Sequence, residues 1–287
     1  MPAKAELLVT PARLAELLSA SAAVAVDCRF ELSDKNSGRK AWLAGHIPGA
    51  AYAHLDNDLA APETIASGRH PLPQASDFAA FLGRIGWDRS KLLVAYDERN
   101  NAMAARLWWL MRNFGLDAAL LDGGLEAWSR AGLPLETGIV NEAAEGPPVL
   151  QPQADMTVSA RTILDDLGQR SLTLLDARSP ERYCGEVEPI DSKAGHIPGA
   201  LNRPFALNLD ESGCFKTADQ LRGEFSALLR GRPPGSVVHS CGSGVTACHN
   251  RFAMELAGLD PGMVYAGSWS EWVRDETRPI ATGSSPG

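Results

Sequence analysis

The stretch Ala44-Gly-His-Ile-Pro-Gly-Ala50 recurs without change as Ala194-Gly-His-Ile-Pro-Gly-Ala200. Upstream of these copies, Val26-Asp-Cys-Arg29 corresponds to Leu175-Asp-Ala-Arg178. Further motifs follow in both halves in the same order and with nearly the same spacing. Self-similarity of this length indicates a repeated structural unit. The chain is therefore a tandem duplication of one domain.

Each copy alternates short apolar runs with amphipathic segments, a pattern typical of strands that alternate with helices. In the second half, the expected helices are Ser159–Leu167, Leu221–Leu229 and Thr246–Ala257, and the expected strands are Leu172–Asp176, Ser236–Ser240 and Met263–Tyr265. Apolar strands separated by helices predict a mainly parallel sheet. The fold class is α/β, with two tandem domains that each carry helices on both faces of such a sheet.

The domain boundaries follow from the repeat and from local composition. Residues from about 135 to 155 are rich in Pro, Glu, Gly and Ala and show no periodicity, as a linker does. We predict a first domain over residues 1–137, a linker over 138–155 and a second domain over 156–287. The length of 287 residues fits two domains of ordinary size.

Composition excludes several classes of function. The formal net charge is 27 − 35 = −8 without a basic run, which argues against nucleic acid or an anionic membrane as the main partner. The apolar runs are too short to span a membrane. Glu6 and the lack of an apolar core of signal length near the start lead us to expect no secretion. The cysteines are few and scattered, so they predict neither a zinc site nor a disulfide framework. We expect a reduced, cytoplasmic enzyme.

The duplication also provides an internal control. Features in both halves are expected to serve the fold, whereas a feature in one half is a better candidate for chemistry. By this test His46 and His196 tie a turn to nearby backbone. The Asp and Arg that both copies carry, as in Asp27 and Arg29, are expected to form a buried ion pair at a strand end.

The halves differ after the strand that precedes their last long helix. The second half runs Val237-Val-His-Ser-Cys241-Gly-Ser-Gly-Val-Thr246, and the first half runs Leu93-Val-Ala-Tyr-Asp97-Glu-Arg-Asn-Asn-Ala102. Aligning the strands places Asp97 where Cys241 stands. A carboxylate cannot carry transferable sulfur, so we expect the first domain to be non-catalytic.

Cys241 is the candidate nucleophile. It ends a buried parallel strand, where open α/β sheets bind ligands. Gly242 and Gly244 allow the loop to curl so that backbone N–H groups form an anion cradle, and the next helix favours thiolate over thiol. The alternative is an inert buried thiol. We assign that role to the other cysteines, which are Cys28, Cys184, Cys214 and Cys248.

Cysteine phosphatases use a similar strand, loop and helix. In those enzymes an arginine that follows the cysteine by six positions grips the phosphate. The corresponding residue here is Ala247. The loop therefore lacks the main phosphate ligand, which argues against a phosphatase.

The paired Gly-His-Ile-Pro-Gly-Ala motifs and the single loop cysteine resemble the tandem-domain rhodanese sulfurtransferases over nearly the whole chain. The loop from Cys241 to Thr246 resembles the branch that acts on 3-mercaptopyruvate; the thiosulfate-preferring branch carries Arg-Lys at the positions of Gly242 and Ser243. The resemblance implies that Cys241 takes sulfur from 3-mercaptopyruvate as a persulfide. A thiol, a dithiol protein such as thioredoxin, or cyanide then accepts it. The resemblance implies that no metal or organic cofactor is needed.

The resemblance also implies roles for other residues. Backbone N–H groups from Gly242, Ser243, Gly244, Val245 and Thr246 would stabilise the persulfide. A Ser–His–Asp relay would activate the donor thiol, and its matching residues are Ser243, His70 and Asp56. A helix-capping hydroxyl is the alternative for Ser243, and an ordinary loop histidine for His70.

Arg182 matches an arginine that binds the substrate carboxylate in this family, whereas the first half has Ser33 at that place. A solvated surface arginine is the alternative. The family usually adds a second arginine after a Glu-Pro pair, but here Glu188-Pro189 is followed by Ile190. Lys193 is a candidate replacement, although an ammonium group lacks the bidentate fork of arginine.

Two further functions remain open from the sequence. Thiosulfate could be the donor in the same persulfide chemistry. Alternatively, the chain could be a non-catalytic persulfide carrier or a binding module, as degenerate domains of this family often are. The intact Cys241 loop favours an enzyme.

Overall fold

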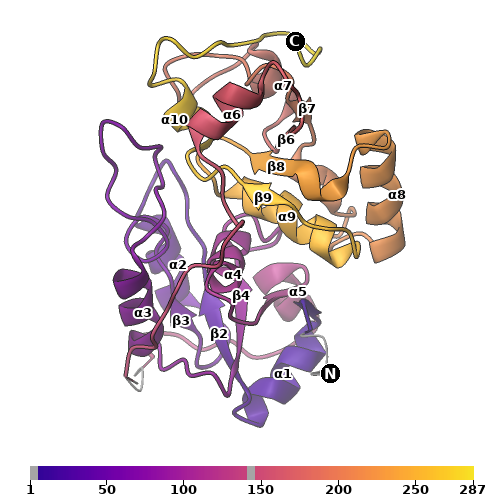
Figure 1. Cartoon of the computed structure of the whole chain (residues 1–287). Coiled ribbons are helices and arrows are strands. Elements are labelled where there is room, and N and C mark those ends of the chain that lie inside the picture. Colours follow the sequence, from indigo (N-terminus) through magenta and orange to yellow (C-terminus); the bar gives the residue numbers. More distant parts are fainter. Residues whose placement is uncertain (1–5, 141–145) are drawn as a thin grey trace. The chain divides into compact units, whose positions relative to one another are not determined.

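The computed structural model describes residues 6–140 and 146–287, which form two compact units (Figure 1). Unit 1 takes in the described parts of residues 1–61 and 72–153 together with 211–214, and unit 2 takes in 62–71, 154–210 and 215–287. The 62–71 segment thus packs within unit 2, and residues 211–214 pack within unit 1. The predicted domain bounds stay a prediction. Residues 141–145 of the predicted linker lie outside the described part of the chain.

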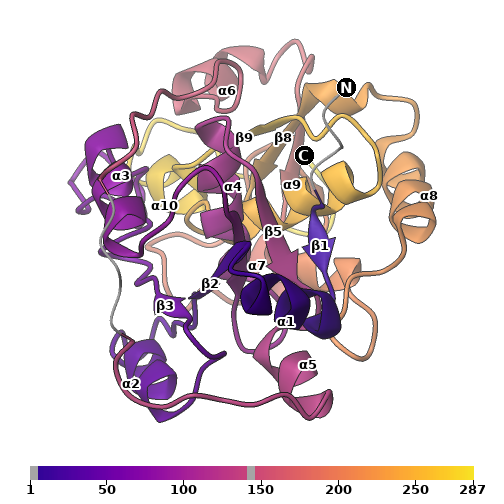
Figure 2. The same ribbon diagram turned by 90° about the horizontal axis from the view of Figure 1, so that it is seen from below.

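Unit 1 is built on a parallel sheet with the strand order β1-β5-β4-β2-β3. The strands are β1 (Leu8–Val9), β2 (Ala23–Asp27), β3 (Ala51–Tyr52), β4 (Leu92–Tyr96) and β5 (Ala118–Leu121). The helices are α1 (Pro11–Ser19), α2 (Ser37–Ala44), α3 (Ala75–Arg84), α4 (Ala104–Asn113) and α5 (Gly124–Arg130). Figure 2 shows β1 beside β5 at one edge of this sheet.

Helices cover both faces of the unit 1 sheet. Val94 and Tyr96 of β4 point into a core that contains Leu14 of α1 and Trp128 of α5. Side chains alternate along a strand, so the residues between them point to the other face, and α4 packs against β4 and β5 there. The strands β2, β4 and β5 are mostly buried on both sides, as their continuous apolar runs predict.

Unit 2 has a parallel sheet with the order β7-β6-β8-β9. Its strands are β6 (Thr173–Asp176), β7 (Leu201–Asn202), β8 (Val237–Ser240) and β9 (Met263–Val264). Its helices are α6 (Ala160–Asp166), α7 (Pro180–Cys184), α8 (Ala218–Leu229), α9 (Thr246–Leu256) and α10 (Ser268–Trp272), with short 3-10 turns at Phe205–Asn208 and Pro234–Ser236.

The predicted α/β class is confirmed, and the predicted elements of unit 2 agree with the structure within a few residues. The largest difference is the start of α8 at Ala218, where the side chains of Thr217 and Gln220 form a reciprocal capping box. Ile163 of α6 and Trp272 of α10 pack in one core with Leu174 and Val238 of the sheet. Among the described residues, no helix is both long and apolar enough to cross a membrane.

The repeated Gly-His-Ile-Pro-Gly motif has the same role in both units. The Nδ1 atom of His46 lies 2.7 Å from the carbonyl oxygen of Trp42, and that of His196 lies 2.8 Å from the carbonyl oxygen of Tyr183. Both histidines are fully buried. A carbonyl only accepts, so Nδ1 carries the proton and ties the turn to the end of a helix.

The repeated Asp and Arg residues form matching ion pairs. Arg29 lies 2.7 Å from Asp27 and donates to the carbonyl oxygen of Gly45 at 2.6 Å. Arg178 lies 2.6 Å from Asp176 and donates to the carbonyl oxygen of Gly195 at 2.7 Å. Each pair thus joins the end of a central strand to the repeated motif.

We predict that Arg29→Met lowers the free energy of unfolding by about 3–5 kcal/mol, because it leaves the buried Asp27 carboxylate without its partner. Urea denaturation followed by tryptophan fluorescence measures this change. Arg13→Met is the matched control, since Arg13 pairs with Glu6 and Glu16 at the surface and the loss of an exposed ion pair is expected to change stability far less. Equal losses in the two variants would contradict the structural role of the buried pair.

Candidate active site

Cys241 and Asp97 occupy equivalent places in the two units. The last residue of β8 pairs with Asp176, and the last residue of β4 pairs with the corresponding Asp27. Cys241 and Asp97 are the next residues in each chain segment. Each therefore lies at the carboxyl end of a central parallel strand, where α/β sheets place ligand-binding groups.

In unit 1 the loop after the strand surrounds the side chain of Asp97 with backbone donors. Its Oδ1 accepts from the N–H groups of Arg99 at 3.2 Å and Asn101 at 2.8 Å. Its Oδ2 accepts from those of Met103 at 2.9 Å and Ala104 at 3.4 Å. Burial raises the pKa of Asp97, and these hydrogen bonds oppose the shift. The loop that follows this strand is thus able to hold an anionic group with main-chain N–H groups alone.

In unit 2 the corresponding loop curls around the sulfur of Cys241. The Gly244 N–H donates to Sγ at 3.1 Å, and the hydroxyl of Ser268 lies 4.0 Å from Sγ. Among the described residues, Gly244 is the one member of the predicted cradle whose N–H is within hydrogen-bond distance of the thiol. Cys241 itself is only 2% exposed, so a donor molecule has to enter the loop to reach the sulfur.

Glycine is required at position 244. Its φ of +76° lies in the left-handed region, and a methyl group there would collide with the carbonyl oxygen of Ala266. Val245 caps the next helix and Thr246 begins it. The partial positive charge at the start of α9 therefore adds to the field at the loop.

Two members of the predicted relay meet in unit 2. Nδ1 of His70 and Oγ of Ser243 are 2.7 Å apart, and both residues are buried. His70 comes from the 62–71 segment, which is part of unit 2. The third member, Asp56, is part of unit 1 and pairs there with Nζ of Lys35 at 2.6 Å. The relay as a whole stays a prediction.

Arg182 is held beside the loop by two carboxylates. Its Nη2 lies 2.7 Å from Glu188 and 3.3 Å from Asp191. Burial disfavours the ionised form of Glu188, but the hydrogen bonds from the Asp191 N–H and from Arg182 outweigh it and lower the pKa of Glu188. Burial raises the pKa of Asp191, against the opposing effect of nearby arginines. Arg182 is thus fixed in place by a partly buried network.

Arg69 is a site residue that the sequence analysis missed. Its Nη1 forms an ion pair with Asp191, and its Nη2 lies within 3.0 Å of where a methyl group on Gly242 would be. In the sequence, the one indication of its role is its position next to His70, a predicted member of the relay. Nothing in the local pattern indicates that this arginine faces the loop.

The side chain of Trp269 contacts the backbone of Lys193. Nε1 of Trp269 donates to the carbonyl oxygen of Lys193 at 2.9 Å. The guanidinium of Arg178 lies 4.9 Å from the centre of the Trp269 ring, a cation–π distance. Trp269 therefore supports the ion-pair network below the loop.

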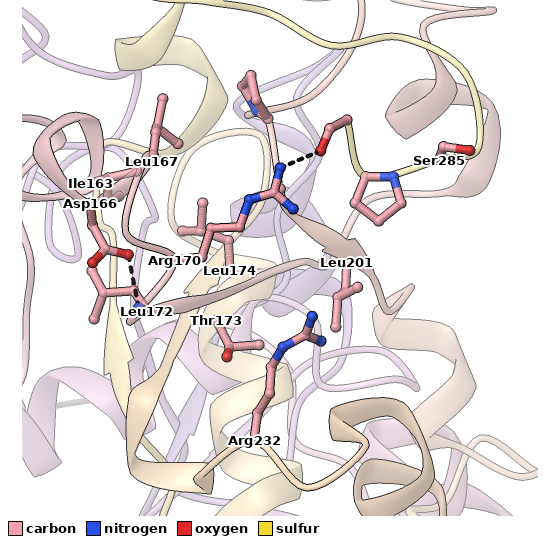
Figure 3. Close-up of a pocket in the computed structure, with 14 residues that line it drawn as sticks. Ile163, Asp166, Leu167, Arg170, Leu172, Thr173, Leu174, Leu201, Arg232 and Ser285 are labelled. Carbon is pink, nitrogen blue, oxygen red and sulfur yellow. Dashed lines mark hydrogen bonds between the residues drawn. The ribbon is translucent and has the colours of Figure 1, made fainter.

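Unit 2 also contains a pocket of about 400 Å³ that is separate from the Cys241 loop (Figure 3). Leu172 and Thr173 line it at the amino end of β6, and Arg170 reaches across it to donate to the carbonyl oxygen of Gly287 at 2.9 Å. Its described lining includes none of the predicted site residues. Cys241 follows the carboxyl end of the parallel strand β8. The pocket therefore lies at the other end of the strands, where they begin.

The loop, the His–Ser pair and the arginines suit nucleophilic chemistry on a small anion. Cys241 supplies a nucleophile, the Gly244 N–H supplies stabilisation of a negative sulfur, and His70 with Ser243 can hold or move a proton. Arg182 supplies positive charge close to these groups.

Known proteins share this organisation. The chain matches the family described as "Rhodanese-like domain" over residues 10–131 and 159–275. It is 48% identical over 279 residues to a Pseudomonas aeruginosa protein named "Probable 3-mercaptopyruvate sulfurtransferase", covering 96% of this chain and 98% of that one. It is 39% identical over 292 residues to Mycobacterium tuberculosis SseB, proposed to be a thiosulfate sulfurtransferase, covering 99% and 100%. The 3-mercaptopyruvate sulfurtransferase structure of Escherichia coli SseA superposes with a TM-score of 0.79 at 32% identity, covering 92% and 99%.

We predict that Gly244→Ala destabilises the protein more than Gly199→Ala does. Both glycines have positive φ, but a methyl group at Gly199 meets open space. The Gly199 variant should lose about 1–2 kcal/mol from backbone strain, and the Gly244 variant about 1–3 kcal/mol more from the collision with Ala266.

Chemical denaturation measures both losses, and alkylation of Cys241 by iodoacetamide reports the loop. The reaction rate should change in the Gly244→Ala variant and stay at the wild-type value in Gly199→Ala. Equal stability losses together with equal alkylation rates would contradict the requirement for glycine at position 244.

Proposed function

Because the chain belongs to the rhodanese family, we propose that it is a sulfurtransferase that moves sulfur from 3-mercaptopyruvate to a thiol or cyanide acceptor through a persulfide on Cys241. The observation that carries this proposal is the cradle after the central strand, which holds a carboxylate of Asp97 in unit 1 and a thiol in unit 2. The relatives named for 3-mercaptopyruvate support the choice of donor.

In the first half-reaction the thiolate of Cys241 attacks the sulfur of 3-mercaptopyruvate. A sulfur–sulfur bond forms, the carbon–sulfur bond breaks, and its electron pair leaves on the carbon as the enolate of pyruvate. The proton of the donor thiol ends on that carbon, so the products are pyruvate and a persulfide anion. The Gly244 N–H, 3.1 Å from Sγ, is suited to stabilise negative charge at this position.

The proton needs a route from the donor sulfur to the enolate carbon. Ser243 and His70, 2.7 Å apart, are the proposed route, because the hydroxyl can accept one proton while it donates its own to the imidazole. Asp56 would orient His70 as the third member of the relay. This assignment extends the observed pair by one residue.

In the second half-reaction an acceptor takes the outer sulfur. Attack by cyanide breaks the sulfur–sulfur bond, forms thiocyanate and returns Cys241 as thiolate. A thiol reacts in the same way and becomes a persulfide. We propose a dithiol protein of the thioredoxin type as the protein acceptor and a cytoplasmic setting, where thiols stay reduced.

We predict that Cys241→Ser abolishes the release of pyruvate from 3-mercaptopyruvate, because a serine hydroxyl cannot form the persulfide. Coupled assay of pyruvate with cyanide as acceptor measures this. Cys184→Ser is the matched control, since Cys184 lies in α7 of the same unit and has no place in the mechanism. Turnover in the Cys241 variant would refute the covalent step.

The same protein and acceptor can decide between donors. The rate of pyruvate release from 3-mercaptopyruvate is compared with that of sulfite release from thiosulfate at matched concentrations. A higher kcat/KM for 3-mercaptopyruvate is expected. A higher value for thiosulfate would assign the chain to the other branch while leaving the persulfide mechanism intact.

We predict that Ser243→Ala lowers kcat for 3-mercaptopyruvate by about 10²-fold or more, the usual range for losing acid–base catalysis. The discharge of a preformed persulfide to cyanide should proceed at nearly the wild-type rate, because that step needs no proton transfer from the donor. Rapid-quench measurement of each half-reaction tests the split. If both half-reactions slow equally, Ser243 shapes the loop and does not relay a proton.

A further inference from the structure

Both units contain a pocket where their strands begin. The pocket in unit 2 has a volume of about 400 Å³ and includes Leu174 of β6 and Leu201 of β7 (Figure 3). The pocket in unit 1 has a volume of about 290 Å³ and includes the corresponding parts of β2 and β3. Each is also lined by the Pro-Gly pair of the repeated motif, which is Pro48-Gly49 in unit 1 and Pro198-Gly199 in unit 2. The pocket is therefore a feature of the repeated fold, and the two copies differ in the side chains that line it.

The first difference is Arg170, whose counterpart in unit 1 is Ser21. Each residue lies between the first helix of its unit and the strand that follows, and each lines the pocket. Each has a φ of +54°, a left-handed value that is uncommon for residues other than glycine. The two backbones thus match closely at this point. A hydroxyl in the first copy is replaced by a guanidinium in the second.

The second difference is Arg232, whose counterpart in unit 1 is Trp87. Arg232 follows Gly231 after the end of α8, and Trp87 follows Gly86 after the end of α3; both glycines have a positive φ. Trp87 is 3% exposed and belongs to the core of unit 1. Arg232 is exposed and lines the pocket of unit 2. The second copy therefore has a cation where the first has a buried aromatic ring.

The contacts around the unit 2 pocket leave one guanidinium free. Nη2 of Arg170 donates to the carbonyl oxygen of Gly287 at 2.9 Å. The carboxylate of Asp166 turns toward the backbone, where its Oδ2 accepts from the Leu172 N–H at 2.8 Å (Figure 3). Among the described residues, the side chain of Arg232 forms no hydrogen bond or ion pair. Its planar fork is therefore open to a ligand.

In unit 1 the cation that lines the pocket is Lys91. Its ammonium group lies 3.7 Å from the carboxylate of Asp88, which is close to it in the chain. That charge already has a partner of its own. Since the duplication separates shared features from those of one copy, a free guanidinium that only the second copy has in its pocket is a better candidate for binding than for folding.

The walls of the unit 2 pocket indicate what kind of anion fits. Ile163, Leu167, Leu174 and Leu201 give it an apolar lining, and its volume of about 400 Å³ is typical of sites for small molecules. One free arginine fork matches one carboxylate. An alkyl or aryl body gains free energy by leaving water for the apolar lining. A polyanion suits the pocket poorly, because Asp166 also lines it.

We infer that the unit 2 pocket binds a small organic acid with one carboxylate and an apolar body, such as a medium-chain fatty acid. Arg232 pairs with the carboxylate, and the apolar body packs against the leucines of the lining. Cys241 follows the other end of the strands, so this acid and a sulfur donor can bind at the same time. The site is independent of the proposed function, and its absence would leave that function intact.

Calorimetric titration with octanoate tests the pocket, and octan-1-ol is the matched probe because it has the same chain without the charge. The wild-type protein should bind one equivalent of octanoate, and bind it more tightly than octan-1-ol. Arg232→Gln should weaken octanoate binding about 5-fold or more and leave octan-1-ol binding unchanged. Between hexanoate and octanoate, each added methylene group should strengthen binding about 4-fold.

Arg161→Gln is the matched control variant. Arg161 lies on α6 near Ile163, but it pairs with Asp165 at the surface and is absent from the described lining of the pocket. This variant should bind octanoate as the wild type does. Thermal unfolding without ligand checks that each variant is folded. Added octanoate should raise the Tm of the wild-type protein more than that of the Arg232→Gln variant.

Three results would overturn the assignment of this pocket. The wild-type protein could bind no octanoate, or the folded Arg232→Gln variant could bind it as tightly as the wild type. Equal affinity for octanoate and octan-1-ol would show that the charge is not recognised.

The place of binding has its own test. The rate at which iodoacetamide alkylates Cys241 should stay the same when octanoate saturates the protein, because the two sites lie at opposite ends of the strands. A slower rate that persists in the Arg232→Gln variant would place octanoate in the Cys241 loop and contradict the assignment.

Discussion

The chemistry of this protein depends on main-chain N–H groups that point at one side chain after a central strand. In unit 1 they surround the Asp97 carboxylate, and in unit 2 the Gly244 N–H reaches Sγ of Cys241 at 3.1 Å. The directions of backbone N–H groups are set by the conformation of the loop, so they do not change unless that conformation changes. One residue at the strand end therefore decides whether these donors surround a carboxylate or face the sulfur of a thiol.

The features that the halves share serve a different purpose. Arg29 and Arg178 each bind a strand-end aspartate and the carbonyl of a repeated glycine, at 2.6 and 2.7 Å. These contacts join the sheet to the turn that precedes the next strand. Because a buried charge without its partner is costly, we expect both copies to need the pair for folding.

The 62–71 segment lies in the first half of the sequence but contributes residues to unit 2. It belongs to the first repeat by sequence but packs within unit 2, where it brings His70 to Ser243 and Arg69 to the side of Gly242. The candidate site residues on this connection are held in place by the structure that surrounds them. The Arg69 guanidinium and its Asp191 partner thus lie beside Gly242 of the loop.

The sequence alone determined the duplication, the α/β class and the main elements of unit 2, and it predicts Cys241 and not Asp97 as the nucleophile. These follow from local periodicity and from comparing one half with the other, which need no knowledge of distant contacts. Only the tertiary structure decided that Arg69 faces Gly242 and that Asp191 pairs with two arginines. From the sequence, Lys193 is the candidate for the second cation beside Arg182, because it is closer to Arg182 along the chain. Which side chains meet depends on the path of the folded chain, and spacing along the sequence does not encode that path.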